Sequence, residues 1–208
     1  MAEKKVMNDY QAEKFLSKYV PVSENQLVKS VNEIKISPPL VLKIISDEAL
    51  HKSDIGGVKF VTDKDNIKKY FNDLLRVASN RKIKLQGIMA QKFYSGEQLI
   101  IGIKKDPVFN HVILFGVGGV FTEIFEDTSI RKCPIDINDA EEMIDELKAA
   151  KIFHGFRGKK LNTKLLKKVL IKVSQIPGKY KNIKEMDINP FMLNEKEGVV
   201  VDARILFE

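Results

Sequence analysis

Apolar residues recur at spacings of three and four in four stretches of the chain, as expected for helices that bury one face. The clearest stretch is residues 65–78, where six apolar side chains share one stripe behind a capping aspartate. Near Asn138, whose side chain can cap a helix, Glu141 occupies the matching third helical position. The four predicted helices cover residues 9–19, 65–78, a segment from about 138 to 147, and 162–175, the last ending at Pro177-Gly178.

Short apolar or β-branched runs of strand length lie between these helices and outnumber them. Several follow one another with no helix between them, which favours antiparallel pairing and an α+β fold over a purely parallel sheet. A lysine-rich stretch at residues 80–84 suggests a boundary between an amino-terminal lobe, 1–84, and a carboxy-terminal lobe, 85–208. The predicted strands are residues 40–45, 57–61, 87–93, 99–104, 112–115, 121–125, 186–193 and 199–205.

Composition agrees with a globular protein that has a sizeable core, because 44% of the 208 residues are apolar and 30% are charged. The net charge of +7 comes from 30 lysines and only 5 arginines, set against 28 acidic residues. Sequence-reading nucleic-acid proteins rely on arginine forks and aromatic stacking. The lysine excess therefore favours solvated surfaces or attraction for small phosphates, and we expect no nucleic-acid partner.

The number of cysteines and the length of the apolar runs indicate the cellular compartment in which the protein is expected. Cys133 is the only cysteine, which excludes an internal disulfide framework and a zinc site built from several cysteines. The longest apolar run, residues 112–121, contains three glycines and is about half the roughly 20 residues that span a bilayer. We expect a cytoplasmic protein with no membrane anchor.

A lysine interrupts an otherwise apolar strand at Lys43. Its side chain could simply reach solvent, or it could hold a positive charge on a rigid strand for a phosphate group. The polar loop that follows contains His51 and the adjacent Gly56 and Gly57, and paired glycines allow a backbone to approach an anion closely. Histidine can accept a phosphoryl group, so this loop is a candidate for phosphate chemistry.

Residues 115–123 form a second glycine-rich segment, Phe-Gly-Val-Gly-Gly-Val-Phe-Thr-Glu. It lacks the Gly-x-Gly-x-x-Gly spacing of dinucleotide folds, because Phe121 stands at the third glycine position. A close-packed connection between two strands explains it equally well.

Two oxygen-bearing side chains are predicted to meet near the carboxyl end. If residues 186–193 and 198–205 form a hairpin with a four-residue loop, Leu193 pairs with Gly198 and Asn189 lies opposite Asp202. Asp202 interrupts an apolar strand and needs a partner, either an arginine such as Arg204 or a cation. Two oxygen ligands completed by water and phosphate suit Mg²⁺, whereas an Asn-Pro turn with a surface ion pair is the non-functional alternative.

Taken in order, these segments resemble the β subunit of ADP-forming acyl-CoA (acetate–CoA) synthetases, which are related to succinyl-CoA synthetase. The matching segments run over nearly the whole chain: Val41 to Ser46, His51 to Val58, Ile101 to Pro107, Phe115 to Gly119, Gly155 to Gly158, Asp187 to Pro190, and Val201 to Arg204.

The resemblance implies an ATP-grasp fold, in which two α+β lobes with antiparallel sheets hold ATP or ADP between them. It places Lys43 at the nucleotide phosphates, with Gly56 and Gly57 in the loop that covers them. Gln91, Lys92 and Phe93 would form the hinge against adenine, and Gln98 stands where the family has a glutamate suited to ribose contact. Mg²⁺ would be held by Asn189 and Asp202.

The implied reaction is acyl-CoA + ADP + phosphate ⇌ carboxylic acid + CoA + ATP, with His51 transiently phosphorylated. The resemblance also implies an α subunit that carries the CoA site and a first phosphorylatable histidine, in an α₂β₂ assembly. The alternative is a non-catalytic ATP-grasp partner that binds nucleotide in an acyl-CoA or protein-acylation system.

Overall fold

The computed structural model describes residues 6–47, 55–119, 127–156, 158 and 160–208. The chain separates into two compact units, each with its own sheet. The larger contains residues 1–7, 12–22 and 95–208, and the smaller contains residues 8–11 and 23–94.

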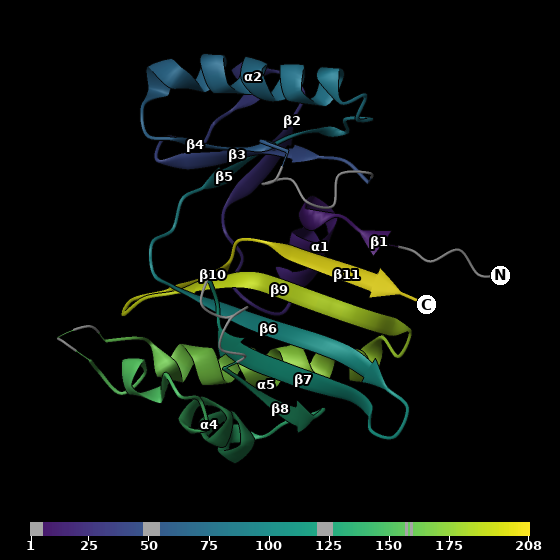
Figure 1. The fold of residues 1–208 in the computed structure, drawn as a ribbon, viewed down its shortest axis with the longest axis vertical. Coiled ribbons are helices and arrows are strands. Elements are labelled where there is room, and N and C mark those ends of the chain that lie inside the picture. The colour runs from purple at the N-terminus through teal and green to yellow at the C-terminus, as the bar shows by residue number, and fades with distance from the viewer. Residues whose placement is uncertain (1–5, 48–54, 120–126, 157, 159) are drawn as a thin grey trace. The chain divides into compact units, whose positions relative to one another are not determined.

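The smaller unit is a four-stranded antiparallel sheet with one long helix on one face (Figure 1). Helix α2 packs through Phe71, Leu74 and Ala78 against alternate side chains of β3, including Leu40 and Leu42. Because strand neighbours point to opposite faces, the residues between them face away from α2. The strand order is β2 (Asn25–Val28), β5 (Gly87–Lys92), β3 (Leu40–Ile45) and β4 (Val58–Val61), and α2 covers Ile67–Asn80.

The larger unit is built on a seven-stranded antiparallel sheet whose centre is the pair formed by β6 (Glu97–Asp106) and β9 (Ile183–Leu193). The order is β1-β11-β9-β6-β7-β8, and β10 also pairs with β9. The remaining strands are β1 (Val6–Met7), β7 (Asn110–Val117), β8 (Thr128–Lys132), β10 (Gly198–Val200) and β11 (Ala203–Phe207).

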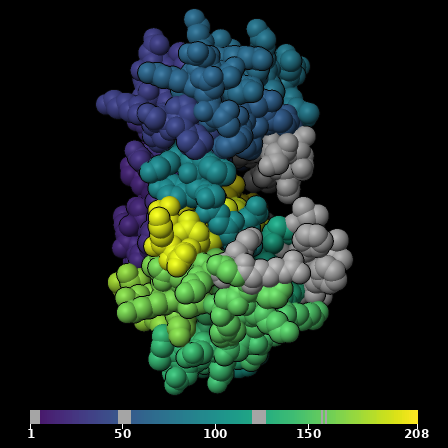
Figure 2. Space-filling view, turned by 90° about the vertical axis from the view of Figure 1, so that its left-hand side faces the viewer, coloured from purple at the N-terminus to yellow at the C-terminus, as the bar shows by residue number. Residues whose placement is uncertain are grey.

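Helices α4 (Ile137–Asp145) and α5 (Thr163–Lys179) cover one face of this sheet and form the green outer surface of the larger unit in Figure 2. Fully buried residues of β9, such as Met186 and Ile188, belong to the same core as Val169 and Leu170 of α5. Helix α1 (Asp9–Leu16) adds Phe15 and Leu16 to that core. The opposite face of the sheet carries the polar side chains of β9.

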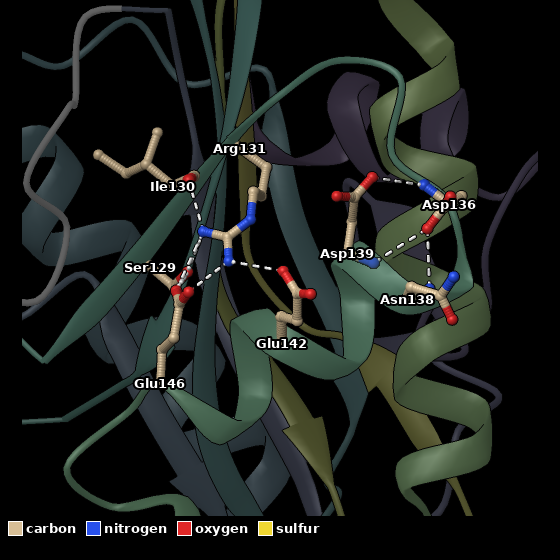
Figure 3. A network of polar contacts seen from close by, with 8 residues as sticks. All are labelled: Ser129, Ile130, Arg131, Asp136, Asn138, Asp139, Glu142 and Glu146. Carbon is tan, nitrogen blue, oxygen red and sulfur yellow. Dashed lines mark hydrogen bonds and ion pairs between the residues drawn. The ribbon is translucent and has the colours of Figure 1, made fainter.

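A charged network attaches α4 to the edge strand β8 (Figure 3). Arg131 on β8 forms ion pairs with Glu142 and Glu146 of the helix, and Ser129 donates a hydrogen bond to Glu146 at 2.6 Å. The arginine lowers the pKa of the Glu146 carboxyl, and Ser129 adds to the effect. These groups are partly exposed, so the network fixes the orientation of α4 more than it adds stability.

The helices differ from their prediction at several of their ends. The cap of α4 is Asp136 with Asp139 in a capping box, in place of Asn138 with Glu141, so the helix begins two residues earlier than predicted. Helix α5 starts at the Asn162 cap and continues through Pro177 to Lys179. Helix α1 ends at Leu16, and α2 begins after a 3₁₀ turn (Lys64–Asn66) that Asp63 caps.

The strands agree with the prediction at their centres, but their extents change. Strands β6, β7 and β9 are longer than expected, and β2 and β8 were not predicted. The expected strand 121–125 lies outside the described residues. The boundary expected at residues 84 and 85 differs from the observed division, because β5 pairs with β2 and β3 and the smaller unit continues to Tyr94.

Two short 3₁₀ turns complete the described elements, Val31–Glu33 and Ala150–Ile152. Asp127 holds the second of these in place by accepting hydrogen bonds from the backbone N–H groups of Lys148 and Ala149. Within the described ranges, no helix combines the length and the apolar character needed to cross a membrane.

Gly96→Ala is expected to destabilise the larger unit, because a Cβ there would lie 2.7 Å from the Leu193 carbonyl carbon and closer still to its oxygen. Backbone atoms cannot rotate away, so we expect a loss of about 2 kcal/mol or more in urea-denaturation experiments. Gly178→Ala is the matched control, since no heavy atom lies within 4 Å of its Cβ position. Equal stabilities of the two variants would contradict the packing at Gly96.

Candidate functional site

Lys43 lies on β3 in the smaller unit, on the face of the sheet that α2 does not cover. It is opposite Val58 of β4 and Met89 of β5, and only 7% of its surface is exposed. Gln91 pairs with Val41, two residues along the same strand, so its side chain shares this face. Gln91 is also buried. The structure therefore brings a buried lysine and a buried amide together on the face of the sheet opposite α2.

The paired glycines lie beside this lysine. The Ile44 N–H donates to the Gly57 carbonyl oxygen at 2.9 Å, so the chain returns to β3 one residue along from Lys43. Gly56 has a positive φ of 74°, a conformation that glycine adopts without strain. His51 lies outside the described residues.

A buried amide anchors the strand end that leads into the His51 loop. The Asn8 side chain donates to Asp47 and to Gln86, both at 3.0 Å, and Gln86 donates to Asp47 at 2.6 Å. Asn8 also caps α1, because its side-chain oxygen accepts the Gln11 N–H while the Gln11 side chain accepts the Asn8 N–H. The Asn8 side chain thus caps helix α1 and also holds Asp47, which follows strand β3, through a hydrogen bond.

The segment Gln91-Lys92-Phe93 already uses part of its hydrogen-bonding capacity. The N–H groups of Lys92 and Phe93 donate to Glu24 and Pro39, at 2.9 and 3.1 Å. The Lys92 side chain lies over the Tyr94 ring, and the Phe93 ring packs against Phe60 with a centroid distance of 4.7 Å. Both phenylalanines are partly exposed. This segment could therefore offer a base an aromatic surface, but not these two N–H groups.

The predicted hairpin register is confirmed in the larger unit. Leu193 pairs with Gly198, and the Asn189 N–H donates to the Asp202 carbonyl oxygen at 3.1 Å. Residues 201 and 202 form a short break between β10 and β11, so Asp202 does not lie within a continuous strand as expected. It is half-buried, and Asn189 is exposed. Because directly opposite residues share a face, both side chains lie on the open side of the sheet.

Asp187 and Arg204, together with Asn189 and Asp202, form a polar block on β9 and at the start of β11, and no site role was predicted for Asp187. The two residues are paired across β9 and β11. The pKa of Asp187 is raised, chiefly because its carboxyl group is desolvated and also because Glu185 is nearby, although part of the side chain remains exposed. Arg204 opposes that increase. The signal in the sequence was the two-residue spacing from Asn189, which places both on one face.

Gln98 lies at one end of β6, beside the second glycine-rich segment. The Gly118 N–H donates to the Gln98 carbonyl oxygen at 2.6 Å, and a Cβ at Gly118 would approach that oxygen to 2.9 Å. This contact supports the packing explanation for Gly118, while the Gln98 side chain remains exposed. Residues 120–123 of this segment lie outside the described residues.

The donor chemistry of the polar block fits a magnesium ion. Asn189 and Asp202 offer oxygen atoms, and both side chains lie on a face that ligand and water can reach. In the described part of the chain, no group of three or more His, Cys, Asp or Glu side chains could hold a metal ion. A site made by these two residues would therefore need water and phosphate to complete its coordination.

Comparison with known proteins identifies the family to which this chain belongs. A model of the ATP-grasp domain family matches residues 1–207. The β subunit of ADP-forming acetate–CoA ligase I from Pyrococcus furiosus is 35% identical, with 99% of this chain and 93% of that subunit covered. The β subunit of isoenzyme II from the same organism is 37% identical, with coverages of 97% and 92%. The chain therefore belongs to the ATP-grasp family and, within it, to the β subunits of ADP-forming acetate–CoA ligases.

A solved structure of acetyl-CoA synthetase 1 from Ca. Korarchaeum cryptofilum, in complex with coenzyme A and Ca-AMPCP, superimposes with a TM-score of 0.94. It is 38% identical and covers 98% of this chain and 94% of that chain. The chain spans 29% of the length of another relative, the ADP-forming acetate–CoA ligase I of Archaeoglobus fulgidus, which is 35% identical. The fold is thus ATP-grasp, with antiparallel sheets as the sequence indicated.

Asn8→Ala is expected to lower the free energy of unfolding by about 2 kcal/mol, because it removes a helix cap and the side-chain donor to Asp47 and Gln86. Urea denaturation followed by circular dichroism would measure the loss. Asn72→Ala on the exposed side of α2 is the control and should cost nothing, since alanine favours a helix more than asparagine does. An unchanged Asn8→Ala protein would show that the network is not stabilising.

Proposed function

We propose that this chain is the nucleotide-binding β subunit of an ADP-forming acyl-CoA synthetase that makes ATP from acyl-CoA, ADP and phosphate. The observation that carries the proposal is the hairpin register, which places Asn189 opposite Asp202 within an ATP-grasp fold. The β subunits of the Pyrococcus furiosus acetate–CoA ligases support the assignment, as does the coverage of nearly their whole length.

Separate groups of residues would bind the nucleotide phosphates and the metal ion. Lys43 is largely withdrawn from water, so its ammonium charge would act on a phosphate with little screening. Gly56 and Gly57 would let the loop backbone approach the same phosphates, and Asn189 with Asp202 would hold Mg²⁺. When bound, Mg²⁺ supplies positive charge that neutralises phosphate oxygens.

The nucleoside would be recognised by Gln91, Lys92, Phe93 and Gln98. The exposed Phe93 ring offers a stacking surface, and the Lys92 and Phe93 N–H groups are already bonded within the unit, so carbonyl oxygens and side chains would supply the polar contacts. Gln98, as a neutral amide, can both donate to and accept from ribose hydroxyls, whereas a glutamate could only accept.

His51 would carry the phosphoryl group between subunits. In the ATP-forming direction the bond between the imidazole nitrogen and phosphorus breaks, and a terminal ADP oxygen forms the new bond to phosphorus. A related Korarchaeum structure is described with a phosphohistidine segment pointing towards the nucleotide site. By analogy, an α subunit would supply the CoA site and the first phosphohistidine, in an α₂β₂ assembly.

Asp202→Ala is expected to weaken ADP binding at least about tenfold in the presence of Mg²⁺ and to change it less than about twofold in EDTA, because only the metal contact is lost. Lys43→Ala should weaken binding in both conditions. Isothermal titration calorimetry would measure these constants, with Glu195→Ala in the exposed hairpin loop as the control. Unchanged Mg-ADP binding by Asp202→Ala would refute the metal assignment.

We expect the isolated chain to convert no acyl-CoA until an α subunit is added. We also expect the His51→Ala variant to abolish ATP formation by the complex while leaving Mg-ADP binding intact. The assay would follow labelled phosphate through acid-labile phosphohistidine into ATP. Turnover by the isolated chain would refute the divided arrangement, and ATP formation by His51→Ala would remove the relay role alone. Nucleotide binding without any phosphoryl transfer would favour the non-catalytic alternative.

A further inference from the structure

A cavity of about 520 Å³ lies in the larger unit, away from the polar block of β9. It is bounded by the turn between β6 and β7, the segment after β8, and the carboxyl end of α5, towards the right in Figure 1. Lys105 and His111, which are paired on β6 and β7, line it. Gln98 occupies the opposite end of β6, so strand register separates this cavity from the residues proposed to contact nucleotide.

The cavity carries uncompensated positive charge. Three lysines line it, and no acidic residue appears among its described lining. Lys105 is paired with Glu208 at 2.6 Å, whereas Lys132 and Lys181 form no ion pair with any described residue. The carboxyl end of α5 contributes about half a negative charge, which offsets only part of two ammonium groups. The net field therefore attracts an anion.

A histidine with a fixed ring orientation lines the same cavity. His111 is 6% exposed, and its Nε2 lies 2.7 Å from the Ile183 carbonyl oxygen, so that nitrogen must carry the proton. The ring orientation is therefore set, and Nδ1 makes no hydrogen bond to another described residue. Cys133 also lines the cavity, but burial raises the pKa of its thiol to about 12, so it adds no negative charge at neutral pH.

Apolar side chains form another part of the wall. Phe109, Pro134 and Pro177 line the cavity, and half of the Phe109 surface is exposed. The turn that carries Phe109 is held by Asp106, whose carboxylate accepts the N–H groups of Val108 and Phe109, both at 2.8 Å. A preformed pocket of this volume, with apolar walls and a few convergent polar groups, has the character of a small-molecule site.

We propose that this cavity binds a small organic phosphate, with its phosphate between Lys132 and Lys181 and its apolar body against Phe109 and the two prolines. Two ammonium groups favour a dianionic phosphate over a singly charged carboxylate. The volume accommodates a ligand considerably larger than inorganic phosphate, and the apolar wall gives that ligand an organic part. The site does not depend on the proposed catalytic function.

Phenyl phosphate is the probe, titrated into the full chain by calorimetry at low salt. We expect saturable binding that the double variant Lys132→Ala/Lys181→Ala weakens at least tenfold, with Phe109→Ala giving a smaller loss. The control Lys168→Ala/Lys172→Ala removes the same charge from the exposed side of α5 and should change affinity less than twofold. Lys43→Ala should also leave binding within twofold, which separates this site from the nucleotide site.

Inorganic phosphate and benzoate test the two halves of the ligand, and both should bind at least tenfold more weakly than phenyl phosphate. Equal affinity for inorganic phosphate would refute the organic part of the proposal, and equal affinity for benzoate would refute the preference for phosphate. Absence of saturable binding, or equal losses in the cavity and control lysine variants, would overturn the site. Each of these results is independent of whether Asp202 and Lys43 bind Mg-ADP.

Discussion

The division of β9 side chains between a buried and an exposed face, with a register shift between Ile188 and Phe191, is the constraint on which the larger unit depends. Met186, Ile188, Phe191 and Leu193 are fully buried, while Asp187 and Asn189 lie on the opposite face. Burying each large apolar side chain contributes about 1.5–3 kcal/mol. A slip of one residue would expose all four and push a carboxylate and an amide into the core, at a cost comparable with the roughly 5–15 kcal/mol that stabilises a whole domain. The hydrophobic core thereby fixes where the polar block lies.

Local signals predicted the parts of this structure that local physics determines. The hairpin register followed from a four-residue loop between Leu193 and Gly198, and the strand of Lys43 followed from its apolar neighbours. The cap at Asp136 was missed because Asn138 is an equally good capping residue, and the sequence does not reveal which turn closes first. Pro177 remains within α5 although proline usually ends a helix.

Contacts between distant segments could not be predicted in the same way. Asn8 meets partners 39 and 78 residues further along the chain, so no spacing pattern connects them. The cavity likewise gathers residues from two strands, the segment after β8 and the end of a helix. Family resemblance identified the ATP-grasp fold and proposed Lys43, Asn189 and Asp202, but it gave no indication of this cavity. The net charge also gave no information about where the positive charges lie in the fold, because the lysines are divided between solvated helix faces, a buried strand and the cavity wall.

The environment of Cys133 has a practical consequence for work on this protein. Because only the thiolate attacks alkylating reagents and disulfides, a pKa raised to about 12 by burial leaves very little of the thiol reactive at pH 7. The native thiol should therefore resist air oxidation and dimerisation through a disulfide bond. An exposed cysteine introduced elsewhere could then carry a fluorescent or spin label selectively, so distances within the assembled enzyme could be followed without first removing the native cysteine.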